Sequence, residues 1–521
     1  MKFIKKVKLH NYRRFSDFSV NLDEKLNIFV GENEAGKSSI LSAINLVLSG
    51  SKSQFEKTGL EKLMNTRAVK EFIASEKKYE NLPIFYVELW LNEQNNFKLN
   101  GNQNSEKLIS DGLRMECVPN DEFSSEINEI LEVEGTYFPY EFYTVKFSTF
   151  SGERYSGYRQ FLNHIVIDTA QIGNEYSIRE YVGDMYKTYV SSSEKNKLEF
   201  AYRKRKEDFK QVEFSKLNDR VKGYNFAVKS DVRANLQTDI TLLEEDIGID
   251  NKGRGKQCFI KTEFALKKAE GVRNKLDIAL IEEPENHLSH INMKRLIKLI
   301  DATEDKQLLI ATHSNFISSR LDLRKLIMLH TSSNSPAHLS QLSEDTAKFF
   351  IKAPDNGVLN FILSKKIILV EGNAEFMLME KFYKSTKGGS VEDAEIYIMS
   401  VGGLSFKRYL EIAKLLGIQV AVIRDNDGDH KSKCIDAYKD YEDSKIKIFF
   451  DTNDERKTFE ICLYQDNKIL CDKIFSSPNR KLDIQEYLLK NKTEGAFKLL
   501  DNSIEISVPS YIKSAIEWVS S

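Results

Sequence analysis

Short apolar runs recur along the chain, and each one ends in glycine or in polar residues. Runs of this length are typical of buried strands. Polar residues that follow the strands of an open sheet converge on one edge of it, where α/β folds place their functional sites. The pattern therefore predicts an α/β protein, with strands over residues 26–30, 278–281, 308–311, 367–370, 420–423 and 446–450.

The first run leads into a glycine-rich loop, Gly-Glu-Asn-Glu-Ala-Gly-Lys-Ser at residues 31–38, and a helix is expected over residues 38–48. In a phosphate-binding loop of this form, backbone N–H groups and the helix N-terminus face the β- and γ-phosphates. A chance glycine-rich turn is the alternative, but strand, loop and helix are all in register. The loop predicts binding of ATP or a related nucleotide, with Lys37 as counter-charge and Ser38 on Mg²⁺. The contact residues expected here are Asn33, Gly36, Lys37, Ser38 and Ser39.

Two later runs end in groups that would complete an ATPase site. Residues 278–281 are followed by Glu282 and Glu283, of which the first is expected to hold Mg²⁺ through water and the second to polarise the attacking water. Residues 308–311 lead to His313, which would lie near the γ-phosphate. A single histidine at a strand end is commonly structural. Its place after a phosphate loop and an acidic strand favours a catalytic role.

This set of motifs resembles the ABC-type ATPases of the RecF and SMC kind. The opening segment, residues 4–21, resembles the N-terminal hairpin of that class. The resemblance implies two heads that sandwich the nucleotide, each lending a signature loop to the other's site. The candidate loop is residues 253–257, with Gly255 and Gln257 on ATP, although a basic glycine loop is commonly only a turn. Glu282 departs from the aspartate usual at its position, which leaves the rate of hydrolysis open.

The second half of the chain carries a different chemistry. Residues 367–370 run into Glu371, and Glu375 follows four positions later on an expected helix. Residues 420–423 run into Arg-Asp-Asn-Asp-Gly-Asp at positions 424–429. Carboxylates gathered at one sheet edge repel each other unless cations lie between them, so Mg²⁺ or Mn²⁺ is the expected occupant.

A calcium-binding loop is the main alternative for residues 425–429. The EF-hand pattern needs glycine at its sixth position and glutamate at its twelfth. His430 and Asp436 stand there instead, and an apolar strand leads in where a helix should. Calcium buffering is therefore not expected.

The strand with Glu371 and Glu375, followed by the strand with Asp425 and Asp427, resembles a Toprim domain. Two later segments extend the likeness: Thr-Phe-Glu at residues 458–460, and Lys492. In this order, the chain resembles the OLD (overcoming lysogenization defect) family of ATP-coupled nucleases, including relatives in Gabija-type anti-phage systems. The resemblance implies two-metal cleavage of DNA, with Lys492 as the transition-state cation. The ligands it implies are Glu371, Glu375, Asp425, Asp427 and Glu460, with Asp429 as a further candidate.

Composition sets limits on these interpretations. The chain has 521 residues, of which 41% are hydrophobic and 30% charged, enough for two or three domains with cores. The net charge of −2 means that DNA contacts must come from local basic patches, such as residues 203–206, though such a run is commonly a solvated helix face. Five scattered cysteines and a lysine-interrupted start favour a reducing cytoplasm.

The expected organisation is an ABC-type ATPase head over residues 1–175 and 246–345, and a Toprim nuclease domain over residues 346–521. Residues 176–245 form a polar insertion with interspersed apolar positions, and in the OLD family the corresponding insertion dimerises. Two rival functions remain. One is an ATP-switched DNA-binding or assembly protein with a non-catalytic Toprim scaffold, which would not need crowded carboxylates. The other is a topoisomerase-like enzyme, which would need a nucleophilic tyrosine on a separate module.

Overall fold

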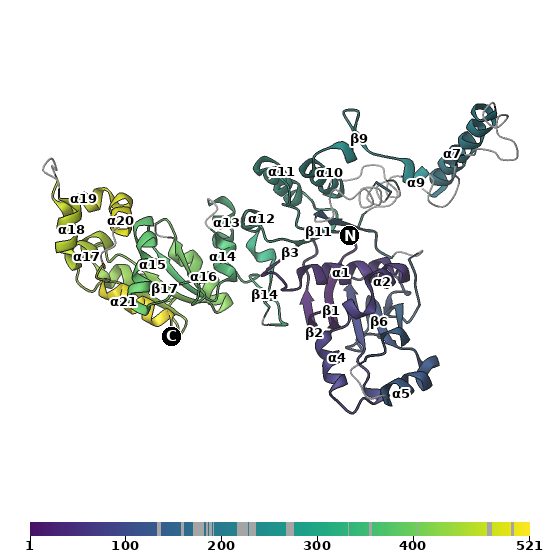
Figure 1. Ribbon diagram of the computed structural model, residues 1–521, viewed down its shortest axis with the longest axis horizontal. Helices are drawn as coiled ribbons and strands as arrows, with labels where there is room; N and C mark the ends of the chain where they lie inside the picture. Colours follow the sequence, from purple (N-terminus) through teal and green to yellow (C-terminus); the bar gives the residue numbers. More distant parts are fainter. Residues whose placement is uncertain are drawn as a thin grey trace. The chain divides into compact units, whose positions relative to one another are not determined.

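The computed structural model of the chain forms two compact units (Figure 1). Unit 1 comprises Met1–Ile317 and Ile327–Pro336, and unit 2 comprises Ser318–Leu326 and Ala337–Ser521. The structure describes all residues except 133–136, 158–160, 170–181, 184–185, 187–189, 191, 216–227, 229–235, 267–275, 332, 354–356, 404, 477–481 and 502–504. The predicted boundary at residue 175 and much of the predicted insertion therefore lie outside the described residues. None of the described helices is both long and apolar enough to cross a membrane.

Unit 1 begins with an antiparallel sheet. Strands β1 (Ile4–Tyr12) and β2 (Phe15–Asn21) pair antiparallel, with Tyr12 opposite Phe15 at the turn, which confirms the predicted hairpin. The hydrophobic side chains of β1 alternate with polar ones, so one face of this sheet is buried. The sheet continues through β4 (Phe85–Leu91), β6 (Ser110–Pro119) and β7 (Tyr143–Thr149), with the short β5 (Asn100–Gly101) on the edge of β6.

The second sheet of unit 1 holds the strands expected to carry the ATPase chemistry. Strand β3 (Leu26–Gly31) pairs in parallel with β12 (Gln307–Ala311), β12 with β11 (Ile278–Glu282), and β11 with β8 (His164–Asp168). Strands β3, β11 and β12 are mostly apolar and almost wholly buried, as expected where both faces of a sheet are covered, whereas the edge strand β8 leaves Val166 exposed. Strand β13 (Leu326–Leu329) lies beside β3. The carboxyl ends of β3, β12, β11 and β8 therefore meet at one edge.

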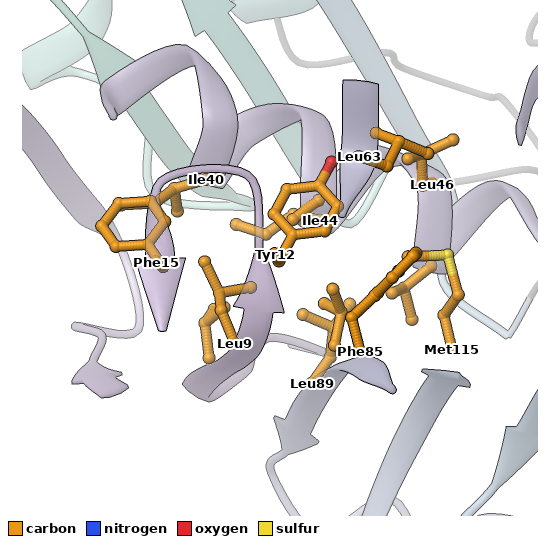
Figure 2. Close-up of a cluster of buried hydrophobic side chains, with 14 of the residues drawn as sticks. Leu9, Tyr12, Phe15, Ile40, Ile44, Leu46, Leu63, Phe85, Leu89 and Met115 are labelled. Carbon is orange, nitrogen blue, oxygen red and sulfur yellow. The ribbon is translucent and has the colours of Figure 1, made fainter. Parts of the chain in front are cut away.

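Helix α1 (Lys37–Ser49) fills the space between the two sheets and joins them into one core. Figure 2 shows Ile40 and Ile44 of α1 among Leu9, Phe85 and Leu89 of the antiparallel sheet. Burying each such side chain stabilises the fold by about 1.5–3 kcal/mol. A charge introduced at Ile44 would therefore be expected to disrupt the head and, with it, the phosphate loop.

The other helices of unit 1 include one that projects from this core (Figure 1). Helix α7 (Ser192–Glu213) belongs to the predicted insertion and carries the basic run at residues 203–206 on an exposed surface. The remaining helices and short strands are α2 (Lys52–Thr58), α3 (Leu60–Leu63), α4 (Thr66–Ile73), α5 (Ser124–Glu132), α9 (Leu236–Asp239), β9 (Leu243–Glu244), β10 (Ile247–Gly248), α10 (Arg254–Leu266) and α11 (His290–Asp301). Helix α12 (Asn315–Arg320) runs from unit 1 into unit 2.

Unit 2 is built on a parallel sheet of order β16-β15-β17-β18. Strands β15 (Lys366–Val370) and β17 (Gln419–Ile423) lie at its centre, between β16 (Ile396–Ser400) and β18 (Ile446–Phe449). The helices are α13 (Glu344–Lys352), α14 (Val358–Leu363), α15 (Asn373–Lys387), α16 (Phe406–Leu416), α17 (Phe459–Asp466), α18 (Lys468–Phe475), α19 (Ile484–Lys490), α20 (Lys492–Leu500) and α21 (Ser510–Val519). With two parallel sheets, the predicted α/β class is confirmed.

Candidate nucleotide and nuclease sites

The phosphate loop in unit 1 has the local geometry that its sequence predicts. Gly36 adopts a left-handed φ of 99° as the N-cap of α1, and no side chain caps the helix. A Cβ at Gly36 would lie 2.4 Å from the Phe15 ring, so only glycine fits. The first N–H groups of α1 are thus left for a ligand. The Lys37 Nζ donates to the carbonyl oxygens of Gly31 (2.9 Å) and Glu32 (3.0 Å) within the loop.

The acidic strand meets the phosphate loop at the sheet edge. The Ser38 hydroxyl is hydrogen-bonded to the carboxyl of Glu282, and burial raises the pKa of that carboxyl. This joins the two groups that the sequence assigns to Mg²⁺. Asp168 at the end of β8 stands directly opposite Glu282 in the parallel register, and its charge raises the pKa of Glu282 further. Sequence reasoning missed Asp168, because the pairing of β8 with β11 cannot be read from either strand.

Glu283 and His313 form the other half of this site. The backbone N–H of His313 donates to Glu283 Oε2 (3.3 Å), and His313 Nε2 lies 3.3 Å from Glu283 Oε1. Burial, together with a hydrogen bond to Glu285, raises the pKa of Glu283 to about 8. Burial and the nearby Lys37 lower the pKa of His313, which favours a neutral imidazole. An open cavity of about 680 Å³ is lined by Glu283 and His313 together with Asn33, Glu285, Asn286, Met293 and Ser314.

Two arginines of the β1–β2 turn also reach this region, although the sequence motifs assigned them no role. Arg13 lies near the hydroxyls of Ser39 (3.5 Å) and Ser42 (3.4 Å) on α1. Arg14 donates to the carbonyl oxygen of Glu34 in the phosphate loop (3.0 Å). The signal that could have identified them is their position in a hairpin that comes immediately before the strand of the phosphate loop.

The predicted signature loop stands at the start of α10. Gln257 is buried, and its side-chain amide donates to the carbonyl oxygens of Asp250 (3.3 Å) and Lys252 (2.7 Å). A Cβ at Gly255 would lie 2.1 Å from the His287 carbonyl oxygen, so glycine permits close packing on the loop after β11. Both residues therefore have structural roles within their own head. Their contact with a nucleotide on a second head stays a prediction.

In unit 2, carboxylates from several elements converge at the ends of β15 and β17. Glu371 follows β15, and Glu375 lies buried in the first turn of α15. Asp425 follows β17, and its Oδ1 accepts the N–H of Phe459 at the start of α17 (2.8 Å). Glu460, the next residue of α17, is buried as well. Four carboxyl groups from distant parts of the sequence thus come close enough to influence one another's charge.

The electrostatics show how crowded this cluster is. Burial raises the pKa of Asp425 to about 8, and the charges of Glu375, Glu371 and Glu460 add to the effect. Burial and the charge of Glu460 raise the pKa of Glu375 to about 7. The Lys492 Nζ lies 3.0 Å from Glu460 Oε1, with the Lys492 side chain 51% exposed and that of Glu460 4% exposed. Burial opposes the charged form of Lys492, but the neighbouring carboxylates outweigh it and raise its pKa.

The donor set fits a divalent cation. Among the described residues, Glu371 Oε2 and Glu460 Oε2 are buried without a hydrogen-bond partner, which is costly unless a cation or a proton neutralises them. Carboxylate oxygens are the ligands that Mg²⁺ and Mn²⁺ prefer. Within the described part of the chain, no three His, Cys, Asp or Glu side chains are already gathered at ligating positions. The carboxylates of this cluster would therefore have to close together around the ion.

Family models match the two segments that carry these sites. The model for the AAA ATPase domain matches residues 1–149, and that for the overcoming lysogenization defect protein-like TOPRIM domain matches residues 362–427. The chain combines an AAA ATPase domain with an OLD-like Toprim domain. The resemblance to the OLD family of ATPase–Toprim proteins is confirmed. The Toprim match covers Glu371, Glu375, Asp425 and Asp427, and the ATPase match covers the phosphate loop.

Individual proteins are similar to parts of this chain. A stretch of 51 residues is 39% identical to the DNA replication and repair protein RecF of Bacillus cytotoxicus, which is 10% of this chain and 13% of that protein. The SMC head domain from Thermotoga maritima is 14% identical with a TM-score of 0.30, covering 64% of this chain and 97% of that one. The C-terminal region of the Xanthomonas campestris pv. campestris OLD protein is 20% identical with a TM-score of 0.24. The match covers 30% of this chain and 95% of that one.

Asp427 and Asp429, in the loop after β17, make different contacts. Asp427, at a left-handed φ of 51°, lies 3.4 Å from the guanidinium of Arg424. Arg424 is itself buried and donates to the Tyr438 hydroxyl (3.2 Å). Burial raises the pKa of Glu371, and the charge of Arg424 opposes that shift. The carboxylate of Asp429 instead accepts the N–H of Ser432 (3.0 Å), and both aspartates are exposed. Asp429 therefore caps a local turn, and Arg424 is the residue of this site that sequence reasoning missed.

Proposed function

We propose that this ATPase–Toprim protein is an endonuclease that binds and hydrolyses ATP and cleaves DNA by metal-dependent phosphodiester hydrolysis. The observation that supports this most strongly is the cluster of Glu371, Glu375, Asp425 and Glu460, which buries more negative charge than its neighbours neutralise. A scaffold has no need of carboxylates arranged in this way, because their mutual repulsion destabilises the fold. A nuclease site accounts for the cluster, because the cations needed for cleavage would neutralise its carboxylates.

In the proposed reaction, Glu371, Glu375, Asp425, Asp427 and Glu460 hold the cations. Paired Mg²⁺ or Mn²⁺ ions supply Lewis acidity to the attacking and leaving oxygens when bound. Lys492 lies against Glu460 at the edge of the cluster, with half of its side chain exposed to an incoming phosphate. Its ammonium group is therefore positioned to meet the negative charge that develops on the scissile phosphate. Arg424 restrains Asp427 through their ion pair.

In the ATPase domain, each proposed role falls to a residue at the sheet edge. Lys37 and the free N–H groups of α1 bind the phosphates, and Ser38 and Glu282 hold the accompanying Mg²⁺. Glu283 orients and deprotonates the attacking water, and the neutral His313 lies beside it. The raised pKa of Glu283 suits a general base that operates near neutral pH.

Regulation of cleavage by ATP is supported by contacts of the segment that leaves unit 1. The Thr331 hydroxyl donates to Glu32 Oε2 in the phosphate loop (2.7 Å), and Arg14 donates to the carbonyl oxygens of His330 (3.1 Å) and Thr331 (2.7 Å). Residues 329–331 lead along the chain to the start of the main part of unit 2 at Ala337. A rearrangement of the phosphate loop on ATP binding would therefore be transmitted to residues 329–331 through these hydrogen bonds.

Self-association is proposed from helix α7. Leu198, Tyr202, Phe209 and Val212 recur at the spacing of one helix face, and Leu198, Phe209 and Val212 are exposed. A second copy of the chain would cover them, and a homodimer or larger assembly suits an ATPase whose heads share nucleotides. We further propose a cytoplasmic role in anti-phage defence, which the resemblance to Gabija-type relatives supports.

The test is a cleavage assay on purified protein with supercoiled and linear DNA, in which Mg²⁺, Mn²⁺ and ATP are each added alone and in combination. Cleavage is expected only with a divalent cation, and its rate should change with ATP. Asp425→Asn, a variant of nearly the same size, should be inactive on both DNAs. Cleavage that survives EDTA, or that is equal in Asp425→Asn, would contradict the proposal.

A further inference from the structure

The backbone of Glu283 has an unusual conformation for its residue type. Its φ is 47°, in the left-handed region that glutamate rarely adopts. Such a conformation persists only where the surroundings hold it in place. It also matters for the site, because the direction of the Glu283 side chain depends on it. The question is which groups maintain this conformation.

Three neighbours hold the peptide groups of Glu283. Its own N–H donates to the carbonyl oxygen of Ala311 at the end of β12 (2.8 Å), and its carbonyl oxygen accepts the N–H of Asn286 (3.0 Å). The third neighbour comes from another strand: the hydroxyl of Thr169, just after β8, donates to the Glu283 carbonyl oxygen at 2.5 Å and lies 3.1 Å from that of Glu282. Thr169 is fully buried.

The Thr169 hydroxyl is itself fixed by a side chain. Asn286 Nδ2 donates to Thr169 Oγ1 (3.3 Å), which leaves the hydroxyl proton to point toward the glutamate carbonyl groups. Asn286 thus contacts this turn twice, through its backbone N–H on Glu283 and through its side chain on Thr169. The result is a small buried network that joins β8 to the end of β11.

We infer that Thr169 is a positioning residue for ATP hydrolysis: its hydroxyl, oriented by Asn286, holds Glu283 in the left-handed conformation that directs its carboxylate toward His313. This inference rests on the proposed ATPase activity. Thr169 is fully buried and its hydroxyl is engaged by the turn, so its effect is expected in the catalytic step and not in ATP binding. The hydroxyl is the group that matters, because a methyl in its place has the same size but donates nothing.

The test compares Thr169→Val, which keeps the shape and removes the hydroxyl, with Thr169→Ser, which keeps the hydroxyl. Thr169→Val should lower kcat for ATP hydrolysis by about 10- to 100-fold, the usual range for residues that orient a ligand or catalytic group. Its KM for ATP should stay within about 2-fold of wild type, since kcat and KM report separate interactions. Thr169→Ser should restore most of kcat.

Thr303→Val is the matched control. Thr303 is also a buried threonine of unit 1 whose hydroxyl donates to a backbone carbonyl oxygen, that of Leu299 (2.7 Å), but it lies on the α11 side, away from Glu283. Its variant should lose thermal stability to a similar degree and keep wild-type kcat. In a Glu283→Gln background, adding Thr169→Val should lower kcat no further, because the two residues act through one group.

The outcomes separate the two proposals. If the wild type hydrolyses ATP and Thr169→Val matches its kcat, or if Thr303→Val loses kcat equally, the inference about Thr169 is wrong and the ATPase assignment stands. If Thr169→Ser is as slow as Thr169→Val, the hydroxyl is not the positioning group and the inference also fails. If the wild type binds ATP but never hydrolyses it, the proposed activity and this inference fall together.

Discussion

The ATPase and Toprim sites use the same architecture with a different balance of charge. Both place carboxylates at the carboxyl ends of neighbouring parallel strands. In the ATPase domain, Glu283 is engaged by a backbone N–H and by His313, with Lys37 nearby. In the Toprim domain, Glu371 and Glu460 each leave a buried oxygen without a hydrogen-bond partner among the described residues. The ATPase site thus offers Lys37 and free helix N–H groups to an anion, beside carboxylates for Mg²⁺, whereas the Toprim site offers mainly carboxylates to cations.

The strongest test of this contrast removes one Toprim carboxylate. Asp425→Asn, or Glu371→Ala, should reduce DNA cleavage to background, because the cluster then lacks a ligand for the cation that the reaction needs. ATP hydrolysis should continue near the wild-type rate, since its residues lie in the other unit. Cleavage is measured by gel on supercoiled DNA and ATP turnover by phosphate release. Loss of both activities in a folded variant would mean that the two sites are not chemically separate.

The reciprocal change removes the cation of the phosphate loop. Lys37→Ala should abolish most ATP binding, because it removes the ammonium group that the loop holds in place as counter-charge to the phosphates. Binding is measured with a fluorescent ATP analogue, and Lys62→Ala, an exposed lysine of α3, is the control. Metal-dependent cleavage without ATP should persist at the wild-type basal rate. Wild-type ATP affinity in Lys37→Ala would remove the nucleotide assignment.

Lys492 tests whether the Toprim site also uses a protein cation. If it acts only in the transition state, Lys492→Ala should slow cleavage by on the order of 10²-fold while DNA binding stays near wild type. Lys492→Arg should recover only part of the rate, since a planar guanidinium cannot place its charge at the same point. Lys498→Ala, on the same helix and paired with Glu494, should cut normally. Equal cleavage rates for the alanine variants at 492 and 498 would mean that Lys492 is a surface lysine without a role in cleavage.

The smallest expected effect concerns stability without metal. Because the folded-state pKa of Asp425 is raised from 3.8 to about 8, its stabilising contribution is present at low pH and lost as pH rises through about 8. Asp425→Asn should therefore raise Tm at pH 8, by roughly 2–4 °C, and change it little near pH 4. Mg²⁺ should raise the wild-type Tm more than that of the variant. Calorimetry with the exposed Asp436→Asn as control checks this, and a Tm lowered at pH 8 would contradict it.

The sequence predicted which segments form the strands of both sites. Each apolar run became a strand of the expected sheet, and the residues after it stand at the sheet edge, since strand length and apolar character decide burial. The structure brings together Ser38 and Glu282, which the sequence analysis both assigned to Mg²⁺, and also Lys492 and Glu460, to which it assigned separate roles. Asp168, Thr169 and Arg424 could not be found in this way. The sequence alone does not show whether a polar side chain after a strand bonds to a neighbouring strand or faces water.

What the sequence determined by itself is the identity of the reactive groups: a phosphate loop, an acidic strand and two carboxylate-bearing strands, each encoded within a few consecutive residues. The tertiary structure decided their charge states and their restraints. Gln257 became a buried hydrogen-bonding residue of its own head, Asp429 a turn cap, and Asp425 a carboxyl with a pKa of about 8. These properties depend on burial and on through-space distances between distant segments, which no local pattern of residues contains.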